Sequence, residues 1–273
     1  MKHLTAKLVA GAALTVLSTA VAAGIADTKH NLSDAGLITQ ANSFSGTDEI
    51  CVFCHTPHGA DVNVLAVPLW NRKLDTTGFS TYDTLGTSTL DGQVLAVGSV
   101  SIACLSCHDG TQAMNVMINA PGSGNYNPAG FTLPPATGGW DTDPAATASP
   151  EGSLDYATAS IVNIGKDLTN DHPIGIAYGG GGITTSATTG PTTDADFFLP
   201  DYDATGEYWW VETGTASSGR QKTDLILYNR TFTAGEGPSV ECASCHDPHT
   251  EDQPTFLRTS NAASALCVAC HNK

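Results

Sequence analysis

The hydrophobic residues of this chain lie in short runs, and long stretches rich in Gly, Ser, Thr, Asp and Pro separate them. The longest apolar run, residues 8–21, follows two lysines and ends in small residues. This pattern is typical of a secretory signal peptide, and the run is too short for a membrane span. We expect residues 1–23 to be removed on export, an uncleaved anchor being the alternative, and residues 24–273 to form one domain.

Two short segments carry the aromatic and β-branched residues that favour strands. Residues 208–211 and 225–228 are the strand candidates, and they could pair as a hairpin. Residues 75–98 suit loops with at most one short strand pair, and the Pro- and Gly-rich residues 119–160 indicate loop. The low-complexity stretch 178–200 predicts a solvated loop, with a specific binding role as the alternative.

Helical patterns are equally short. Residues 99–117 allow a helix that Gly110 breaks, and residues 261–271 predict a short helix near the C-terminus. Residues 48–58 predict a helical turn that Pro57 interrupts. The chain is therefore expected to be mostly coil, with short helices and a few short strands.

The sequence Cys-x-x-Cys-His occurs four times. The four motifs, called first to fourth below, are Cys51/Cys54/His55, Cys104/Cys107/His108, Cys242/Cys245/His246 and Cys267/Cys270/His271. This signature is typical of c-type haem attachment, in which both thiols bond to the haem and the histidine binds its iron. All eight cysteines lie inside the motifs, so none is left for a disulfide or a free thiol.

Zinc binding and dithiol redox chemistry are the alternatives for paired cysteines. Zinc ribbons space their two pairs by about 15–20 residues. Only the third and fourth motifs come near that spacing, and neither alternative explains a histidine after all four pairs. We therefore expect four covalent haems.

Composition agrees with a fold built on cofactors. Hydrophobic residues make up 41% of the chain, a little below the usual share, so a core of side chains alone would be poor. The sequence predicts a multihaem c-type cytochrome folded around four haems. The motifs fall into two groups, residues 51–108 and 242–271, with a long loop-rich insertion between them.

Each haem also needs a ligand on its second axial side. Besides the four motif histidines and His3 of the leader, the chain has four: His30, His58, His172 and His249. Four haems and four histidines predict bis-histidine ligation throughout, with Met114 and Met117 as rival ligands that more often serve packing. Every iron can then have both axial positions occupied by histidine, which leaves none open for a substrate. We therefore expect an electron carrier and no enzyme.

Spacing suggests how these ligands are shared. His58 and His249 each follow a motif histidine by three residues, which on a helical turn places both on one face. Each should therefore serve a neighbouring haem: His58 that of the second motif and His249 that of the fourth. His172 then falls to the first motif, and His30 is left for the third.

Four segments carry a family resemblance. Residues Cys51–His58 (CVFCHTPH), 68–72 (PLWNR), 167–173 (DLTNDHP) and 240–249 (VECASCHDPH) resemble the extracellular multihaem cytochromes of metal-reducing bacteria, in particular the tetrahaem type that polymerises into nanowire filaments. The resemblance implies one continuous chain of haems through the filament. It also implies that one haem takes a histidine from the adjacent subunit, with His30 as the donor and the C-terminal motif pair as the target.

Charge narrows the possible partners. Removal of the leader takes away two lysines and no acids, so nine basic and 27 acidic side chains remain, a net charge of −18. Nucleic acid and anionic membrane are thus poor partners, whereas other redox proteins or extracellular electron acceptors are suitable. The expected location is extracellular or at the cell surface, after export through the periplasm. A monomeric periplasmic or surface carrier and a multihaem oxyanion reductase stay open as alternatives.

Overall fold

The computed structural model describes residues 24–34, 44–63, 66–123, 125–133, 162–214 and 219–273. Its helices are α1 (Ser99–His108), α2 (Cys242–Cys245) and α3 (Ala265–Cys270). Its strands are β1 (Val116–Asn119), β2 (Tyr126–Thr132), β3 (Ile176–Ala177), β4 (Asp201–Asp203), β5 (Tyr208–Val211), β6 (Leu225–Phe232) and β7 (Gly235–Val240). Short 3-10 turns complete the elements: η1 (Ile25–Asp27), η2 (Cys51–Phe53), η3 (Tyr82–Thr84), η4 (Pro121–Ser123), η6 (Tyr178–Gly180), η7 (Pro254–Phe256) and η8 (Ala262–Ser264). The expected mixture of coil, short helices and short strands is confirmed.

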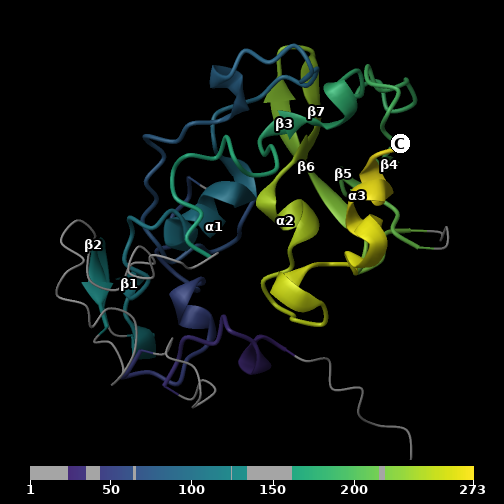
Figure 1. The fold of residues 1–273 in the computed structure, drawn as a ribbon. Helices are drawn as coiled ribbons and strands as arrows, with labels where there is room; N and C mark the ends of the chain where they lie inside the picture. The colour runs from purple at the N-terminus through teal and green to yellow at the C-terminus, as the bar shows by residue number, and fades with distance from the viewer. Residues whose placement is uncertain (1–23, 35–43, 64–65, 124, 134–161, 215–218) are drawn as a thin grey trace, which may run out of the picture.

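Five antiparallel strands form the larger sheet, in the order β3-β7-β6-β5-β4. The expected hairpin of residues 208–211 and 225–228 is confirmed, because β5 pairs with β6 and Trp209 lies opposite Leu227. A two-residue turn joins β6 to β7, and Gly235 permits it by adopting a φ of +127°. In Figure 1 this sheet lies beside α2 and α3, away from β1 and β2.

The first half of the chain has a smaller sheet and one longer helix. α1 ends at His108, two residues before Gly110, whose φ of +73° ends the helix. The expected continuation of the helix to residue 117 is wrong, because Val116 and Met117 pair with β2 instead. β2 also places a strand inside residues 119–160, which the Pro and Gly content had indicated as loop.

Two predicted elements at the motifs are confirmed. The helical turn expected within residues 48–58 is η2, and the short helix expected within residues 261–271 consists of η8 and α3. None of the residues of α3 is buried. The protein alone therefore gives this last motif little packing.

One loop prediction is confirmed and one needs correction. Residues 75–98 form loops without a strand pair in the described structure, and single bridges tie Ser80 to Asp167 and Val94 to Ile176. Residues 178–200 are not a solvated loop, because Tyr178 and Ile183 are buried in the core. Small and polar residues of this stretch pack closely because backbone hydrogen bonds hold them, such as those from Thr193 and Asp194 to Gly181 and Gly179.

The described core is divided into three small clusters, and each of them packs against a motif cysteine. One cluster, around Phe44, Phe53 and Met117, contacts Cys54 and Cys107. The second, around Trp209 in the larger sheet, contacts Cys270, and the third, around Trp70, again contacts Cys54. The apolar interior is thus arranged beside the motifs and not in one continuous core.

The expected leader, residues 1–23, and residues 134–161, which fall mostly within the expected loop, lie outside the described residues. Among the helices of the described part, none has the length and apolar character that crossing a bilayer requires.

Candidate haem-binding sites

Each motif folds as a single helical turn. The backbone N–H of the motif histidine donates to the carbonyl of the first cysteine at 2.7 Å in the first motif, 3.2 Å in the third and 3.0 Å in the fourth. The second motif lies at the C-terminal end of α1. Residues three and four apart on such a turn lie on one face. Both thiols and the imidazole can therefore approach one ligand, as covalent haem attachment requires.

Hydrogen bonds fix the orientation of three motif histidines. The Nδ1 atoms of His55, His108 and His246 lie 2.8, 2.7 and 2.8 Å from backbone carbonyl oxygens of Pro68, Val162 and Thr255. A neutral imidazole that donates from Nδ1 leaves Nε2 as its acceptor nitrogen. This is the arrangement of most metal-ligating histidines, so these residues fit haem ligation through Nε2.

Two of the remaining histidines face motif histidines at a distance that suits a shared iron. The ring centroids of His55 and His249 are 6.4 Å apart, and those of His108 and His30 are 6.2 Å apart. An imidazole nitrogen binds a transition metal at about 2 Å, so two rings on opposite sides of one ion have centroids roughly 6 Å apart. The first and second motifs thus each have a partner histidine within their own chain.

His30 is held firmly in this position. Its Nδ1 lies 3.1 Å from the Pro248 carbonyl oxygen, and its ring stacks on Phe256 with centroids 4.3 Å apart. Burial lowers the pKa of His30 and also that of His108, with nearby histidines adding to both shifts. A lower pKa keeps the imidazoles neutral, which is the form that binds a metal.

A cavity of about 380 Å³ lies at the fourth motif. Both His172 and His271 line it, together with Tyr178 and Phe197. Burial lowers the pKa of His271, and the nearby His172 lowers it further. The glycine-rich residues 179–180 form part of the wall, so a segment expected to be a solvated loop belongs to a candidate binding site.

These contacts favour a pairing of the histidines that differs from the expected one. His249 lies beside His55 of the first motif, His172 lines a cavity with His271 of the fourth, and His30 lies beside His108 of the second. The three-residue offset does not place His249 on a helical face, because α2 ends at Cys245 and His246 is already extended, with ψ of 141°. The set of eight ligand histidines itself stays a prediction.

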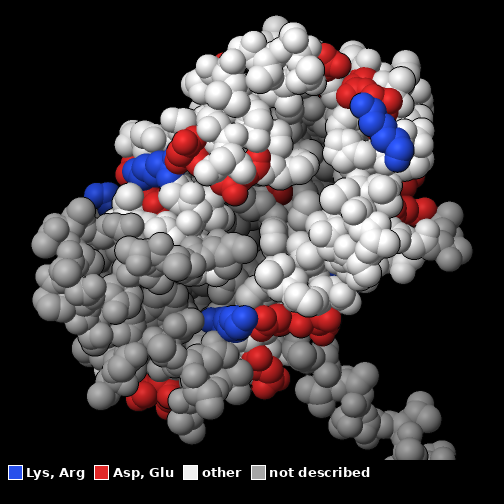
Figure 2. All heavy atoms as spheres, in the orientation of Figure 1, with Lys and Arg blue, Asp and Glu red and all other residues white. Residues whose placement is uncertain are grey.

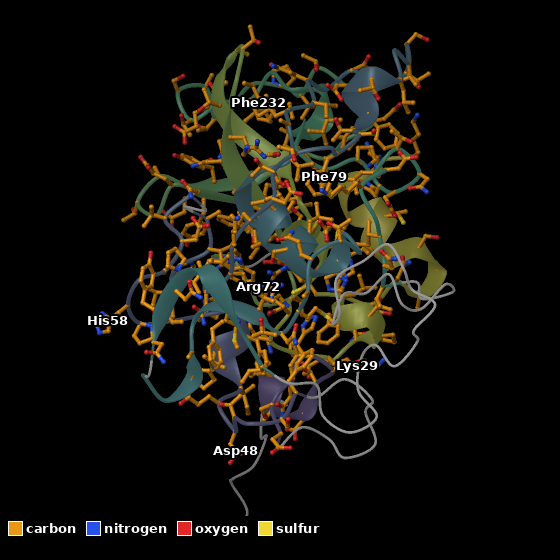
Figure 3. The ribbon with its side chains drawn as sticks, turned by 90° about the vertical axis from the view of Figure 1, so that its left-hand side faces the viewer. Lys29, Asp48, His58, Arg72, Phe79 and Phe232 are labelled. Atoms are coloured by element: carbon orange, nitrogen blue, oxygen red, sulfur yellow. The ribbon has the colours of Figure 1, made fainter. Side chains whose placement is uncertain are left out.

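Two histidines have no facing histidine ring among the described residues: His246 of the third motif and His58. His246 lies near enough to His108 to lower its pKa, but its ring is held at the Thr255 carbonyl oxygen. The ring of His58 is exposed and has no hydrogen bond, ion pair or ring contact among the described residues, and in Figure 3 it projects from the edge of the molecule. Among the described non-motif histidines, His58 is thus the one whose ring is unpaired and accessible.

The four motifs follow one another in space in the order of the sequence. In three places a thiol of one motif lies near a thiol of the next motif: Cys54 near Cys107, Cys104 near Cys242, and Cys245 near Cys267. Burial raises the pKa of Cys54 to about 12 and that of Cys245 to about 11, and the neighbouring motif's thiol adds to each shift. A hydrogen bond between Cys104 and Cys242 raises the pKa of Cys104 and lowers that of Cys242. Groups attached to these cysteines would form one series through the molecule.

The tripeptide Trp70-Asn71-Arg72 joins the first motif to the second. The Trp70 ring meets His55 edge-on, with centroids 5.8 Å apart, and its buried indole N–H has no partner among the described residues. The Asn71 backbone N–H donates to the Cys54 carbonyl at 2.9 Å, and its side chain donates to Val52 at 2.6 Å. The Trp70 ring therefore lies beside the candidate iron ligand of the first motif.

A buried carboxylate joins the second motif to the third. Glu241 accepts hydrogen bonds from Ser101 of α1 and from Ser239, and it pairs with Arg230 at 2.8 Å. Ser101 in turn accepts from the Cys242 backbone N–H at 3.0 Å. Burial raises the pKa of Glu241, although these hydrogen bonds and Arg230 oppose the shift.

Sequence reasoning assigned no role to Glu241, Ser101 or Arg72. Both Arg72 and Glu241 lie in segments that carry the family resemblance, and Glu241 directly precedes the third motif. Ser106 is 34 residues from Arg72 and Ser101 is 140 residues from Glu241, so only the folded structure shows these contacts.

Replacing His30 with alanine should open one of the four irons without changing the other three. The reason is that the His30 ring lies 6.2 Å from that of His108, whereas the nearby His246 is held at the Thr255 carbonyl oxygen. Electron paramagnetic resonance of the exported protein should show one high-spin signal per subunit. Four low-spin irons in His30→Ala would contradict the assignment.

One family model matches the chain, the doubled CXXCH motif, over residues 235–273. This match covers the third and fourth motifs and shows that the chain has a haem-binding region like that of c-type cytochromes. It supports covalent haem c and, in general terms, electron transfer. No curated protein matches the chain.

Proposed function

We propose that the chain is an extracellular electron-transfer cytochrome that carries four covalent, bis-histidine haems and polymerises head to tail into a conductive filament. Residues of the four motifs would hold the haems, which supply one-electron redox chemistry when bound. The protein chain positions the imidazoles and excludes other ligands; it acts as a conduit and not as an enzyme. The observation that carries the proposal is the arrangement of the eight histidines.

The placement of six histidines supports three intrachain ligand pairs, because two pairs of rings face each other and His172 and His271 line one cavity. In this proposal His58 is then a ligand without an iron, and the iron at His246 lacks a second ligand. Met114 and Met117 do not fill that vacancy, because both are buried in the cluster beside Cys54 and Cys107. We infer that His58 of one subunit completes the third motif of the next, in place of the His30 contact that the family resemblance suggests.

The surroundings of His58 favour a protein contact. Three exposed apolar side chains, Val62, Leu69 and Tyr126, are each more than half exposed. Tyr126 packs over Gly59, next to His58, and the Leu69 carbonyl accepts a hydrogen bond from the Thr56 backbone N–H. Apolar side chains grouped around an unpaired ligand are typical of an interaction site.

A ligand histidine at one surface of a chain and an iron that lacks a ligand at another surface generate open polymers. Such a heterologous contact continues indefinitely unless its rotation happens to close a ring. Because the motifs follow one another in space, each junction would extend one series of haems. The large negative charge opposes close approach of subunits, which suits a contact held by iron coordination. Figure 2 shows acidic side chains scattered over one face, with wide uncharged areas between them.

Haem content and spin state test this proposal in one sample. The intact mass of the exported protein should exceed that of the processed chain by four haem masses. Its absorption and resonance Raman spectra should show only low-spin, six-coordinate iron. A mass with three or fewer haems in fully matured protein would rule out the tetrahaem assignment, and a methionine–iron charge-transfer band would rule out bis-histidine ligation.

The unpaired His246 also supports a second candidate, a reductase with one open iron. A multihaem enzyme that reduces a small oxyanion needs such a vacancy, and the third motif would supply it. Nitrite or hydroxylamine would then change the spectrum of one haem in four, which a closed filament does not allow. A monomeric carrier would show the same vacancy but no turnover, and its size in solution would not exceed one subunit.

A further inference from the structure

We propose that Arg72 is a fixed, buried positive charge that raises the reduction potentials at the first two motifs above those at the last two. The inference rests on the proposed function in requiring haems at the motifs. Arg72 itself is not a candidate iron ligand, and it contacts neither His58 nor His246, the two residues of the proposed subunit contact. Figure 3 places Arg72 inside the molecule, in contrast to His58 at its edge.

Arg72 has no acidic partner. Its side chain is 2% exposed, and none of the ion pairs among the described residues includes it. The guanidinium donates only to neutral oxygens: Ser106 Oγ at 3.2 Å and the backbone carbonyls of Ser106, Ala113, Met114 and Val116 at 2.9, 2.7, 2.6 and 3.2 Å. All its donors are used, so the charge is solvated by dipoles and not neutralised.

This charge lies between the first two motifs. Ser106, which accepts two of its hydrogen bonds, is a residue of the second motif. Arg72 also follows Trp70 and Asn71, which contact His55 and Cys54 directly. Both motifs therefore lie within the electrostatic reach of a poorly screened cation.

Two partly buried arginines of the C-terminal half differ from Arg72 in having anions beside them. Arg230 pairs with Glu241 at 2.8 Å, and Arg258 lies 3.8 Å from Asp247. Each of these pairs adds little net charge to the third and fourth motifs. The chain therefore places an uncompensated cation at one end of its series of motifs and neutralised ones at the other.

Asp109 carries a negative charge that opposes the positive charge of Arg72 at the second motif. It is buried and follows His108, and its carboxylate accepts hydrogen bonds from Thr111 and Gln112 but none from Arg72. Its charge offsets that of Arg72 at the second motif. The effect of Arg72 should therefore be largest at the first motif.

A cation in a low-dielectric interior stabilises any neighbouring group that gains an electron. In a titration the electron comes from dithionite, and each ferric iron takes up one electron to become ferrous. The alternative is a purely structural role, in which Arg72 only organises five oxygens. The two roles can be separated, because lysine keeps the charge but cannot reproduce the planar set of hydrogen bonds.

Spectroelectrochemical titration of the exported protein tests the proposal with four variants. In Arg72→Gln the most positive one-electron step should move to lower potential, whereas Arg72→Lys should keep that step near its wild-type position. Asp109→Asn, which removes the opposing charge, should move a step to higher potential. Arg220→Gln removes a similar charge from an exposed position and serves as the control, with no shift expected.

Equal shifts of the reduction potential in Arg72→Gln and Arg72→Lys would overturn the proposal in favour of a structural role. The proposal would also be overturned if all four one-electron steps kept their wild-type potentials in both variants. If Arg72→Gln does not mature, the other two variants decide between the roles. A charge effect alone leaves the most positive step unshifted in Arg72→Lys and raises the potential of a step in Asp109→Asn. The difference between steps in the wild type should also persist at about 1 M salt, which screens surface charges but not buried ones. Failure of the proposed function is visible separately, as fewer than four haems or high-spin iron in the wild type.

Discussion

Replacing His58 with alanine should abolish fibres of the exported protein and leave one of its four irons high-spin. Both effects have one cause, because within the part of the chain that the structure describes the His58 ring has no partner and His246 has no facing histidine ring. Removing the ligand would remove the contact that joins subunits and also the sixth bond of one iron. Electron microscopy and electron paramagnetic resonance on the same preparation measure the two effects together.

His30→Ala is the matched control for this variant. It removes one imidazole, as His58→Ala does, but from a site where His30 faces His108 of the same chain. One high-spin iron is expected in both variants, and loss of fibres only in His58→Ala. Fibres that persist in His58→Ala with four low-spin irons would show that His58 is not the intersubunit ligand.

Preventing haem attachment should leave the exported chain without a cooperative fold. The structure gives the physical reason: its core is divided into three small clusters, and α3 has no buried residue at all. A group that binds only the folded state contributes its binding free energy to stability, and here that contribution would come from four large apolar cofactors. The free energy of unfolding of the haem-free chain is expected to be close to zero.

Replacing all eight cysteines with alanine provides the haem-free chain. Near-ultraviolet circular dichroism and a denaturant titration should show no fixed aromatic packing and no sigmoidal transition. The five-stranded sheet is the part with the most packing of its own, centred on Trp209, so any residual structure should be there. A cooperative transition with native aromatic signals would contradict a fold that depends on its haems.

Local patterns in the sequence predicted the local structure at the motifs. Helical structure was predicted at the first, second and fourth motifs and is present there, whereas α2 at the third motif was not predicted. The aromatic and β-branched residues of β5 and β6 predicted their hairpin. The helix proposed for residues 99–117 was correct only as far as Gly110. Beyond it, Val116 and Met117 meet a partner strand, and pairing with β2 decided the outcome.

The pairing of histidines could not be predicted in the same way. His30 and His108 are separated by 78 residues, and nothing local to either one indicates the other. The spacing of His249 suggested a helical face, but the chain is already extended at His246. The same limit applies to Arg72 and Glu241, whose roles depend on acceptors and donors brought together from distant segments.

A reconstruction of the exported protein by cryo-electron microscopy tests the central claim most directly. The account predicts a filament in which each subunit holds four haems in one series, with His55 facing His249, His108 facing His30, and His271 facing His172. The fourth iron, at His246, should be bound by His58 of the adjacent subunit. Single subunits in which His58 remains in solvent and the iron at His246 is open or bound from within the chain would contradict it.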